Sequence, residues 1–305
     1  MSDIFAKFNA LAQQATGKTT EERLKEAEEA EIRGYKFALP VVKKEEKEKV
    51  EEEAKQQIDF VWGESLRGVP NSVLRSALFT ATKRGKRKSM FREKLAAQSG
   101  INILFSGLRL DQADLDVWQQ VLHISRATKF GVKVEFTGGS FLKAIGRNTS
   151  GASHEWLKDS LTRLMISAVE LSDGKKTFSG QLIHNWYLDE VDKKCVVELN
   201  PQLMNLFAHD SWTAIEWEQR KQLKGKPLAQ WLHGFYSSHA HPFDMKVETL
   251  HGLCGSETSE MKVFKQNLQE ALKDLATATG WFCRIENNKV QIFKDQSHLL
   301  ARLTK

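Results

Sequence analysis

The sequence predicts an α+β fold in which one unit occurs twice, behind an N-terminal arm of different composition. The first observation is a repeated order: an amphipathic helix, a short strand, a short helix, a polar turn, a longer helix and a hairpin. The second is a regular offset, since Trp118 and Trp231, like Lys133 and Lys246, are 113 residues apart (231 − 118 and 246 − 133). A supersecondary order repeated at a fixed offset indicates a duplicated domain.

The third observation is the composition of residues 1–56, which are rich in Glu and Lys and interrupted at Gly34 and Pro40. They carry 13 acidic and 11 basic side chains, net −2, so the rest of a chain of net charge +6 carries +8 (+6 − (−2)). We expect a charged arm that is helical or disordered. The predicted divisions after it are a linker at 57–69, a first domain at 70–194 and a second domain at 195–305.

The first copy begins with a helix at 111–129. Its predicted buried stripe is Leu115, Trp118, Val121, Leu122 and Ser125. A strand at 131–137 and a short helix at 138–146 follow, and Gly146 closes the helix. Ser153 is a predicted N-cap for the longer helix. The apolar face of that helix is Leu157, Leu161, Leu164, Met165 and Ala168. Residues 167–190 alternate around Asp173 and Gly174, which predicts a hairpin.

The second copy repeats this order with helices at 228–239, 249–255 and 259–275, a strand at 245–248 and a hairpin at 281–294. The longest helix has an apolar face of Met261, Phe264, Leu268, Leu272 and Leu275. A helix-turn-helix followed by a hairpin is the order of a winged-helix domain, so the sequence predicts two tandem winged helices.

Composition indicates an ordinary soluble protein, with 41% hydrophobic and 28% charged residues. The sequence contains no apolar run long enough for a membrane helix and no signal peptide, so we expect a cytoplasmic protein without a membrane partner. Cys195, Cys254 and Cys283 are too far apart for a zinc site and are expected to be reduced, mostly buried thiols. The basic excess is a weak indication of a polyanionic partner.

Motifs for catalysis are incomplete. Gly17-Lys18-Thr19 resembles the end of a phosphate-binding loop, but Ala12 stands where that loop needs glycine. The stretch DQADLD at 111–116 is explained by acids favoured in a first helical turn. We therefore predict no enzyme activity, no metal and no cofactor.

A third function class remains open on the pair His239 and His241, since His-x-His holds the metal of nicking enzymes that initiate rolling-circle replication. The required tyrosine, with lysine three residues later, is not present at Tyr35, Tyr187 or Tyr236. Loop histidines are the favoured interpretation.

Nucleic acid binding would use the outward face of each longer helix, its turn and the hairpin. In the second copy the candidates are Ser256, Thr258, Ser259, Lys262, Lys265, Gln266 and Gln269. In the first copy they are Thr149, Ser150, Ser153, Lys158 and Arg163, with Lys175 and Lys176 in the hairpin. Lysine can read guanine and glutamine can read adenine, so the second copy is expected to read bases more directly.

The densest basic run contains Lys83, Arg84, Lys86, Arg87 and Lys88, with Arg92 just beyond. It has two interpretations: a segment that follows a phosphate backbone with salt-sensitive affinity, or a solvated loop.

Several segments closely resemble the TrfA family of replication initiators from broad-host-range plasmids. They are VPNSVLRSALFT at 69–80, VWQQVL at 117–122, AIEWEQRKQL at 214–223, FYSSH at 235–239 and LCGS at 253–256. The resemblance extends over about residues 57–305, and the first 56 residues do not share it.

The resemblance implies a pair of winged helices that binds directly repeated iterons at a plasmid origin and helps to open AT-rich DNA beside them. Its implied partners are duplex DNA, single-stranded DNA of the opened origin, host DnaA, the DnaB helicase and the polymerase sliding clamp. It also implies that monomers bind the repeats, in equilibrium with a reserve homodimer, and that the protein has no catalytic centre.

The family also has a clamp-binding peptide of the form Gln-Leu-Ser/Asp-Leu-Phe before its first domain. The residues at the matching place are Gln57, Ile58, Asp59, Phe60 and Val61. A glutamine and adjacent apolar side chains on an extended segment can fill such pockets. Phe60 and Val61 depart from Leu-Phe, and the alternative is that these side chains cover the first core.

The function predicted from the sequence is thus a plasmid DNA replication initiator. The alternative is a winged-helix transcriptional regulator, which needs the same groove and phosphate contacts.

Overall fold

The computed structural model describes residues 62–83, 85–126, 133–172, 174, 177–189, 191–207 and 211–295. The charged arm, the peptide Gln57–Val61, Arg84, Lys175 and Lys176 lie outside these ranges. Helices and short strands are mixed throughout the described part, which confirms the α+β prediction. Within it, no helix combines the length and apolarity needed to cross a membrane.

The first part of the described chain precedes the predicted first repeat. Its elements are β1 (Leu66–Pro70), α4 (Asn71–Leu74), β2 (Phe79–Thr80), β3 (Ser89–Leu95), β4 (Asn102–Leu108) and β5 (Leu110–Asp111). Strand β1 pairs antiparallel with the distant β11 (Trp212–Glu216), and Trp62 is only 3% exposed. The predicted linker at 57–69 therefore includes packed structure from Trp62 onward.

The first copy contains α5 (Gln112–Ser125), β6 (Lys133–Thr137), α6 (Gly138–Ala144), α7 (Gly151–Ile166), β7 (Ala168–Ser172), β8 (Thr177–Gln181), β9 (Ile183–Leu188) and β10 (Lys194–Leu199). The 3₁₀ helix Pro201–Leu206, β11 and α8 (Trp217–Gln222) follow. The second copy contains α9 (Pro227–Ser237), β12 (Met245–Lys246), α10 (Val247–Leu253), α11 (Met261–Thr279), β13 (Phe282–Glu286) and β14 (Lys289–Phe293).

Each copy builds a three-stranded antiparallel sheet of the same topology. The strand orders are β6-β10-β9 and β12-β14-β13, and in both the helix pair lies between the first strand and the final hairpin. The apolar faces of α7 and α11 correspond as well, since Leu157, Leu161 and Leu164 precede the buried Leu268, Leu272 and Leu275 by 111 residues (268 − 157). The two copies therefore share one local architecture.

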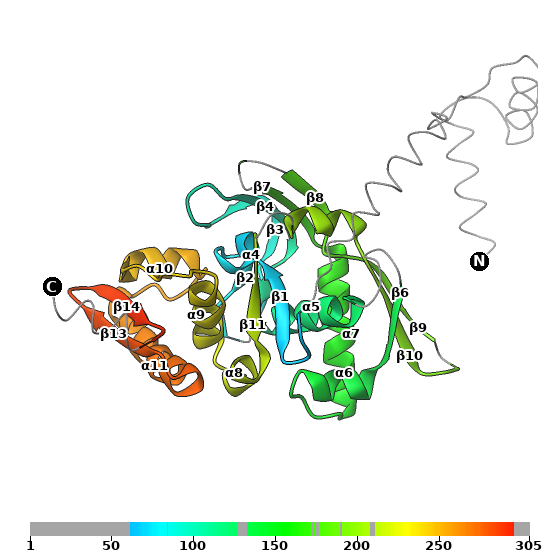
Figure 1. Cartoon of the computed structure of the whole chain (residues 1–305). Coiled ribbons are helices and arrows are strands. Elements are labelled where there is room, and N and C mark those ends of the chain that lie inside the picture. The colour runs from blue at the N-terminus through cyan, green and yellow to red at the C-terminus, as the bar shows by residue number, and fades with distance from the viewer. Residues whose placement is uncertain are drawn as a thin grey trace, which may run out of the picture. The chain divides into compact units, whose positions relative to one another are not determined.

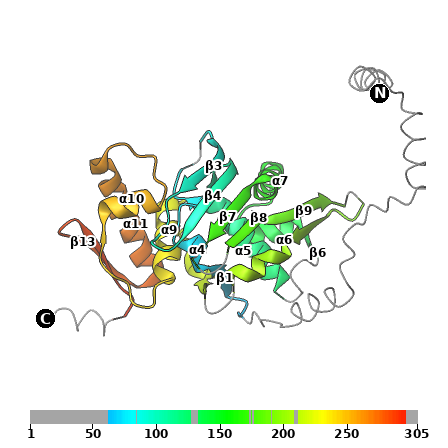
Figure 2. The ribbon, with the colours of Figure 1, turned by 90° about the horizontal axis from the view of Figure 1, so that it is seen from above.

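The hairpin predicted around Asp173 and Gly174 exists, but it belongs to a different sheet. Strands β7 and β8 pair with each other, and β7 pairs with β4 to form the four-stranded sheet β3-β4-β7-β8. Figures 1 and 2 show these four strands in succession, with β9 near β6. The hairpin equivalent to β13–β14 is therefore β9–β10. Alternation reveals a hairpin, but it does not reveal which sheet the hairpin joins.

The offset between the copies is also not constant. The buried tryptophans of α5 and α9 keep the predicted 113 residues, whereas Thr137 before α6 and Lys246 before α10 are 109 apart (246 − 137). The predicted match of Lys133 with Lys246 is therefore wrong, because Lys133 is the first residue of β6, whereas Lys246 is the last residue of β12. The strand β12, which is three residues shorter than β6, accounts for most of this difference.

Helix ends refine two further predictions. Helix α7 is capped by Ser150, whose Oγ accepts a hydrogen bond from the Ser153 backbone N–H, so Ser153 is not the cap. Ala168 lies in β7, after the end of α7. Helix α5 begins as its sequence predicts: Asp111 and Asp114 form a capping box in which each carboxylate accepts from the other's backbone N–H.

Two hydrophobic cores divide the described chain. One runs from Trp62 to Trp217 and the other from Leu223 to Ile292. The predicted boundary at 194/195 falls inside β10, whose Cys195 and Val197 are buried in the first core. The cores instead divide between Trp217 and Leu223, because β10 completes the sheet of the first copy.

Candidate nucleic-acid interface

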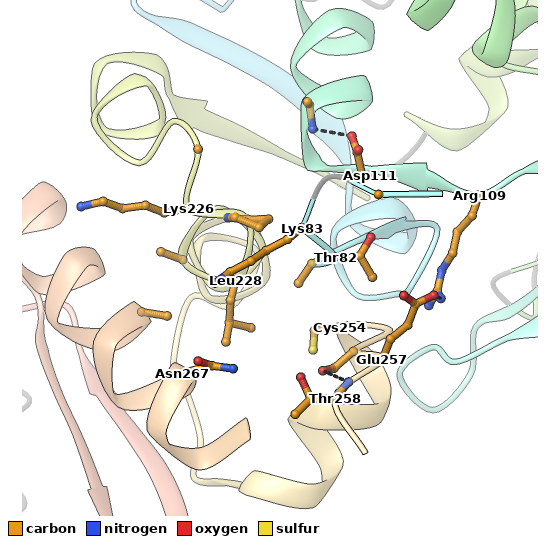
Figure 3. A pocket seen from close by; sticks show the side chains of 18 of the residues that line it. Thr82, Lys83, Arg109, Asp111, Lys226, Leu228, Cys254, Glu257, Thr258 and Asn267 are labelled. Atoms are coloured by element: carbon orange, nitrogen blue, oxygen red, sulfur yellow. Dashed lines mark hydrogen bonds and ion pairs between the residues drawn. The ribbon is translucent and has the colours of Figure 1, made fainter. Parts of the chain in front are cut away.

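A cleft of about 820 Å³ lies between the loop residues 81–83 and 85–88, α7, the start of α9 and α11 (Figure 3). The predicted DNA-binding residues that line it are Lys83, Lys86, Arg87, Lys88, Arg163, Ser256 and Thr258. The structure thus brings the basic loop between β2 and β3 and the turn before α11 to one surface. The sequence separation between them hides this proximity.

Two of these basic residues already have a buried partner. Arg87 Nη1 and Arg163 Nη2 each lie 2.8 Å from a carboxylate oxygen of Asp114, which is fully buried. Ser160 Oγ donates a further hydrogen bond to Asp114 Oδ1 at 2.7 Å. A buried carboxylate needs such compensation, so Arg87 and Arg163 attach the loop to α7 through Asp114, and their guanidinium groups are engaged within the fold rather than offered to DNA.

Asp111 takes part in the same network through Arg87 Nη2, 2.6 Å from its Oδ2. Burial and the nearby Asp114 carboxylate raise the pKa of Asp111, and Arg87 opposes that shift. The basic run is therefore partly neutralised by acids that the sequence places more than twenty residues away.

Other lysines of the loop stay accessible. In the described part of the chain, Lys83 and Lys86 are exposed and lie within 4 Å of no carboxylate. Lys88 pairs with Glu93 at 2.6 Å, but both side chains are exposed, so the pair is weak and easily exchanged for another anion. Arg92 contacts Glu170 through two hydrogen bonds.

The turn between α10 and α11 is held by residues of its own copy and by residues that precede the first copy. Gly255 has a φ of +64°, and a Cβ there would meet Arg109 and Thr80, so a side chain is excluded on both grounds. Arg109 Nη2 donates to Gly255 O at 2.6 Å, and Arg109 also pairs with Glu257. His251 Nε2 lies 2.8 Å from Thr258 O. The turn therefore has a defined orientation relative to the strands that precede the first copy.

Helix α11 has one buried and one exposed face. Phe264, Leu268, Ala271, Leu272 and Leu275 face the core. Lys262, Gln266, Gln269 and Lys273 lie on the opposite side and are exposed. These four positions carry no carboxylate, and the exposed Glu270 lines the cleft beside them. Lys265 is half-buried at the flank, and Ser259 is exposed just before the helix. Met261, predicted for the apolar face, is instead 36% exposed.

Helix α7 presents a different face. Glu155 and Asp159 are exposed, and Lys158 pairs with Glu155 at 3.0 Å. Because acids repel phosphate, α7 is less suited than α11 to the DNA surface. Before it, Thr149 and Ser150 are exposed, while Ser153 Oγ donates to Asn148 Oδ1 within the turn.

Sequence reasoning missed Asn267, Arg109 and Lys226, which also line the cleft. Figure 3 shows Asn267 across the cavity from Thr82 and Lys83. Asn267 lies between the apolar and outward faces of α11, and the helical period could have placed it there. The contribution of Arg109 depends on its long-range contact with Gly255, which no local pattern reveals.

Two residues of the alternative nicking site, Tyr236 and His239, are buried, whereas His241 is exposed. Tyr236 is 1% exposed, and burial raises the pKa of its hydroxyl. His239 is also buried, with Nδ1 2.7 Å from Phe235 O, and burial lowers the pKa of its imidazole. A tyrosine in this position is inaccessible to a DNA phosphodiester.

The three cysteines are free thiols, and those of Cys195 and Cys254 are buried. Burial raises the pKa of each of the three thiols to about 12. They are therefore protonated at neutral pH and lack the thiolate character of reactive cysteines.

A family model described as TrfA protein matches residues 18–288. The match begins well before residue 57, where the resemblance was expected to start. The plasmid replication initiator protein TrfA of Escherichia coli is 29% identical over 223 residues, which cover 70% of this chain and 58% of that protein. The chain therefore spans less than two thirds of that relative's length.

Two solved structures resemble the chain at low sequence identity. Domains 2 and 3 of RctB superpose with a TM-score of 0.51 at 15% identity, over 73% of this chain and 94% of that one. The Pi initiator protein in complex with iteron DNA gives a TM-score of 0.46 at 12% identity, over 59% and 92%. The likeness to RctB concerns the fold alone, and nothing is inferred from the lower TM-score of the Pi structure.

Proposed function

The chain belongs to the TrfA protein family, and from this we propose that it is a plasmid DNA replication initiator that binds repeated sequences, or iterons, in duplex DNA. The observation that supports DNA binding most directly is the outward face of α11, with Lys262, Gln266, Gln269 and Lys273 exposed and no carboxylate among them. Lysine donates to guanine, and glutamine recognises adenine with two hydrogen bonds. No catalytic role is part of the proposal.

We take the two copies to be tandem winged helices. Their shared strand orders, β6-β10-β9 and β12-β14-β13, with a helix pair before each hairpin, support this assignment. The first would end near Trp217 and the second would begin near Leu223, where the cores divide.

In the proposed complex α11 enters the major groove. Lys83 and Lys86, on the same cleft, contact phosphates of the adjacent backbone, as does the Lys88 ammonium once released from Glu93. The turn hydroxyls of Ser256, Thr258 and Ser259 contribute contacts beside the helix start.

The first copy has a supporting role on the DNA. The acids on α7 disfavour base reading, so Thr149, Ser150, Ser153 and Lys158 would contact phosphate near the start of that helix. Arg84, Lys175 and Lys176, outside the described residues, remain proposed phosphate contacts.

From membership of the family we also propose the other activities of a replication initiator. These comprise opening of the AT-rich region, binding of its single strands, recruitment of DnaA and DnaB, and an exchange between binding monomers and a homodimer. The peptide Gln57–Val61 is proposed to bind the sliding clamp. Replacing Gln57 and Phe60 with alanine should weaken clamp binding at least tenfold while iteron binding is unchanged, and unchanged clamp binding would refute that assignment.

Footprinting on the native plasmid origin at several salt concentrations tests the central proposal. We expect protection of direct repeats, with an affinity that falls steeply as salt rises. Equal protection of repeats and unrelated DNA would overturn it. Permanganate reactivity of the neighbouring AT-rich DNA distinguishes an initiator, which exposes unpaired thymines there, from a transcriptional regulator, which leaves the duplex closed.

A further inference from the structure

Two large apolar side chains stand exposed in the first turn of α11. Met261 is 36% exposed and Val263 is 39% exposed. The described residues include eight exposed large hydrophobic side chains, and Met261 and Val263 are the pair separated by the fewest residues. Single exposed apolar residues are common, but two on either side of the leading base-reading lysine, Lys262, point to a shared purpose.

The surroundings indicate which surface covers them. Lys262 lies between them, and Gln266 lies one turn further along. The exposed charged residues of α11 are two lysines, Lys262 and Lys273, and one acid, Glu270. This charge suits a polyanion. The major groove of duplex DNA combines phosphate walls, polar base edges and one prominent apolar group, the C5-methyl of thymine.

Met261 and Val263 lie in the first turn of α11. This position suits contact with the major groove, because recognition helices contact base edges mainly through their N-terminal residues. Successive residues of a helix are turned by about 100°. Met261 and Val263 therefore flank Lys262 on opposite sides and would reach base pairs on either side of the one that Lys262 faces.

We propose that Met261 and Val263 contact thymine C5-methyl groups in the major groove, so that part of the sequence specificity is apolar. The inference rests on the proposed function and deepens it: the bound repeat must place thymines beside the base pair read by Lys262. Hydrogen bonds alone would not require the methyl group.

Deoxyuridine substitution tests this directly, because it removes only the thymine methyl. The full chain is titrated with a fluorescent duplex containing one footprinted repeat, in which each thymine is replaced in turn. The same series is measured for Met261→Ala and Val263→Ala. Ile166→Ala is the matched control, since Ile166 is 51% exposed at the end of α7. Binding to a scrambled duplex reports whether each variant is folded.

For the wild type, uracil at one or two positions should weaken binding roughly three- to tenfold, as expected for one buried methyl group. That penalty should vanish in Met261→Ala or Val263→Ala and persist in Ile166→Ala. The inference is overturned if no position changes affinity more than about twofold, or if both α11 variants keep the full penalty. If the wild type binds the repeat no better than the scrambled duplex, the proposed function fails, and this inference fails with it.

Discussion

Arg220 and Asp116 form an ion pair between α8 and α5, with Nε and Oδ1 2.6 Å apart and Arg220 only 1% exposed. The guanidinium also donates to Gln112 O and Oε1 and to Gln230 O, while Gln230 Nε2 donates to Asp116 Oδ2. One side chain thus joins the last helix of the first core, its central helix α5 and the first helix of the second copy. The pair therefore connects the part of the chain that builds the first core with the first helix of the second copy.

Loss of this arginine should destabilise the fold strongly. Arg220→Ala removes the guanidinium from Asp116, which keeps only the Gln230 amide as a donor, and from the Gln112 oxygens. We expect the free energy of unfolding to fall by about 3–5 kcal/mol. Lys221→Ala is the control on the same helix, because its pair with Glu218 is more exposed and should contribute less than about 1 kcal/mol. Urea denaturation measures both. Equally small decreases in the free energy of unfolding for both variants would show that Arg220 does not stabilise the contact between these helices.

Substitution of Arg163 should lower stability without weakening DNA binding, whereas substitution of the loop lysines should weaken DNA binding without lowering stability. Arg163→Ala should lower the free energy of unfolding by about 3 kcal/mol, since Asp114 stays buried with less compensation. Folded Arg163→Ala protein should bind DNA within about twofold of the wild type. A large affinity loss without destabilisation would instead make Arg163 a DNA contact.

Lys83→Ala and Lys86→Ala should behave in the opposite way. Each should leave thermal stability unchanged and weaken specific and non-specific binding alike. The slope of log affinity against log salt should become shallower by about 0.9 for each phosphate that the variant no longer neutralises. Lys94→Ala, an exposed lysine of β3, is the control. A slope that does not change in either loop variant would leave the solvated-loop interpretation.

If α11 reads bases, substitutions on its outward face should reduce sequence specificity and not only the electrostatic attraction to DNA. Lys262→Ala and Gln266→Ala should each cost about 1–3 kcal/mol of specific binding and relax the preference at one base pair. Binding to scrambled DNA should change little for Gln266→Ala, which removes no charge. Measuring each variant against duplexes with every single base change identifies the position. Specific binding that survives both substitutions would contradict the assignment.

Buried His233 should make the protein sensitive to acid. Burial, then the nearby Arg220 and Lys294 charges, lower the pKa of this imidazole from its ordinary 6.5 to about 3. Between these values the unfolded chain binds the proton and the folded chain does not, so stability is lost as pH falls below about 6.5. From pH 7 to pH 5 this amounts to about 2 kcal/mol.

The comparison of wild type with His233→Gln checks that sign. Urea denaturation at pH 7 and pH 5 should show a smaller acid loss in the variant than in the wild type. His184→Gln, an exposed histidine of β9, should leave the acid loss unchanged. An acid loss of the same size in all three proteins would exclude His233 as its source.

The sequence by itself determined the helices and the repetition. The apolar stripes of α5, α7 and α11 recur every three or four residues, and helical geometry alone places such residues on one face. The outward position of Lys262 and Gln266 followed from the same period. Met261 departed from it because the first turn of α11 extends beyond the core that covers Phe264.

Only the tertiary structure decided which strands pair and which charges are available. Strand β7 pairs with β4, more than sixty residues earlier, and Arg163 meets Asp114 across 49 positions. Strand pairing and ion pairing depend on distance in space, and chain folding brings those groups together without a mark in the local pattern. The same folding gathers Lys83, Asn267 and Thr258 around one cleft. The spacing of these residues in the sequence does not reveal that they lie close together.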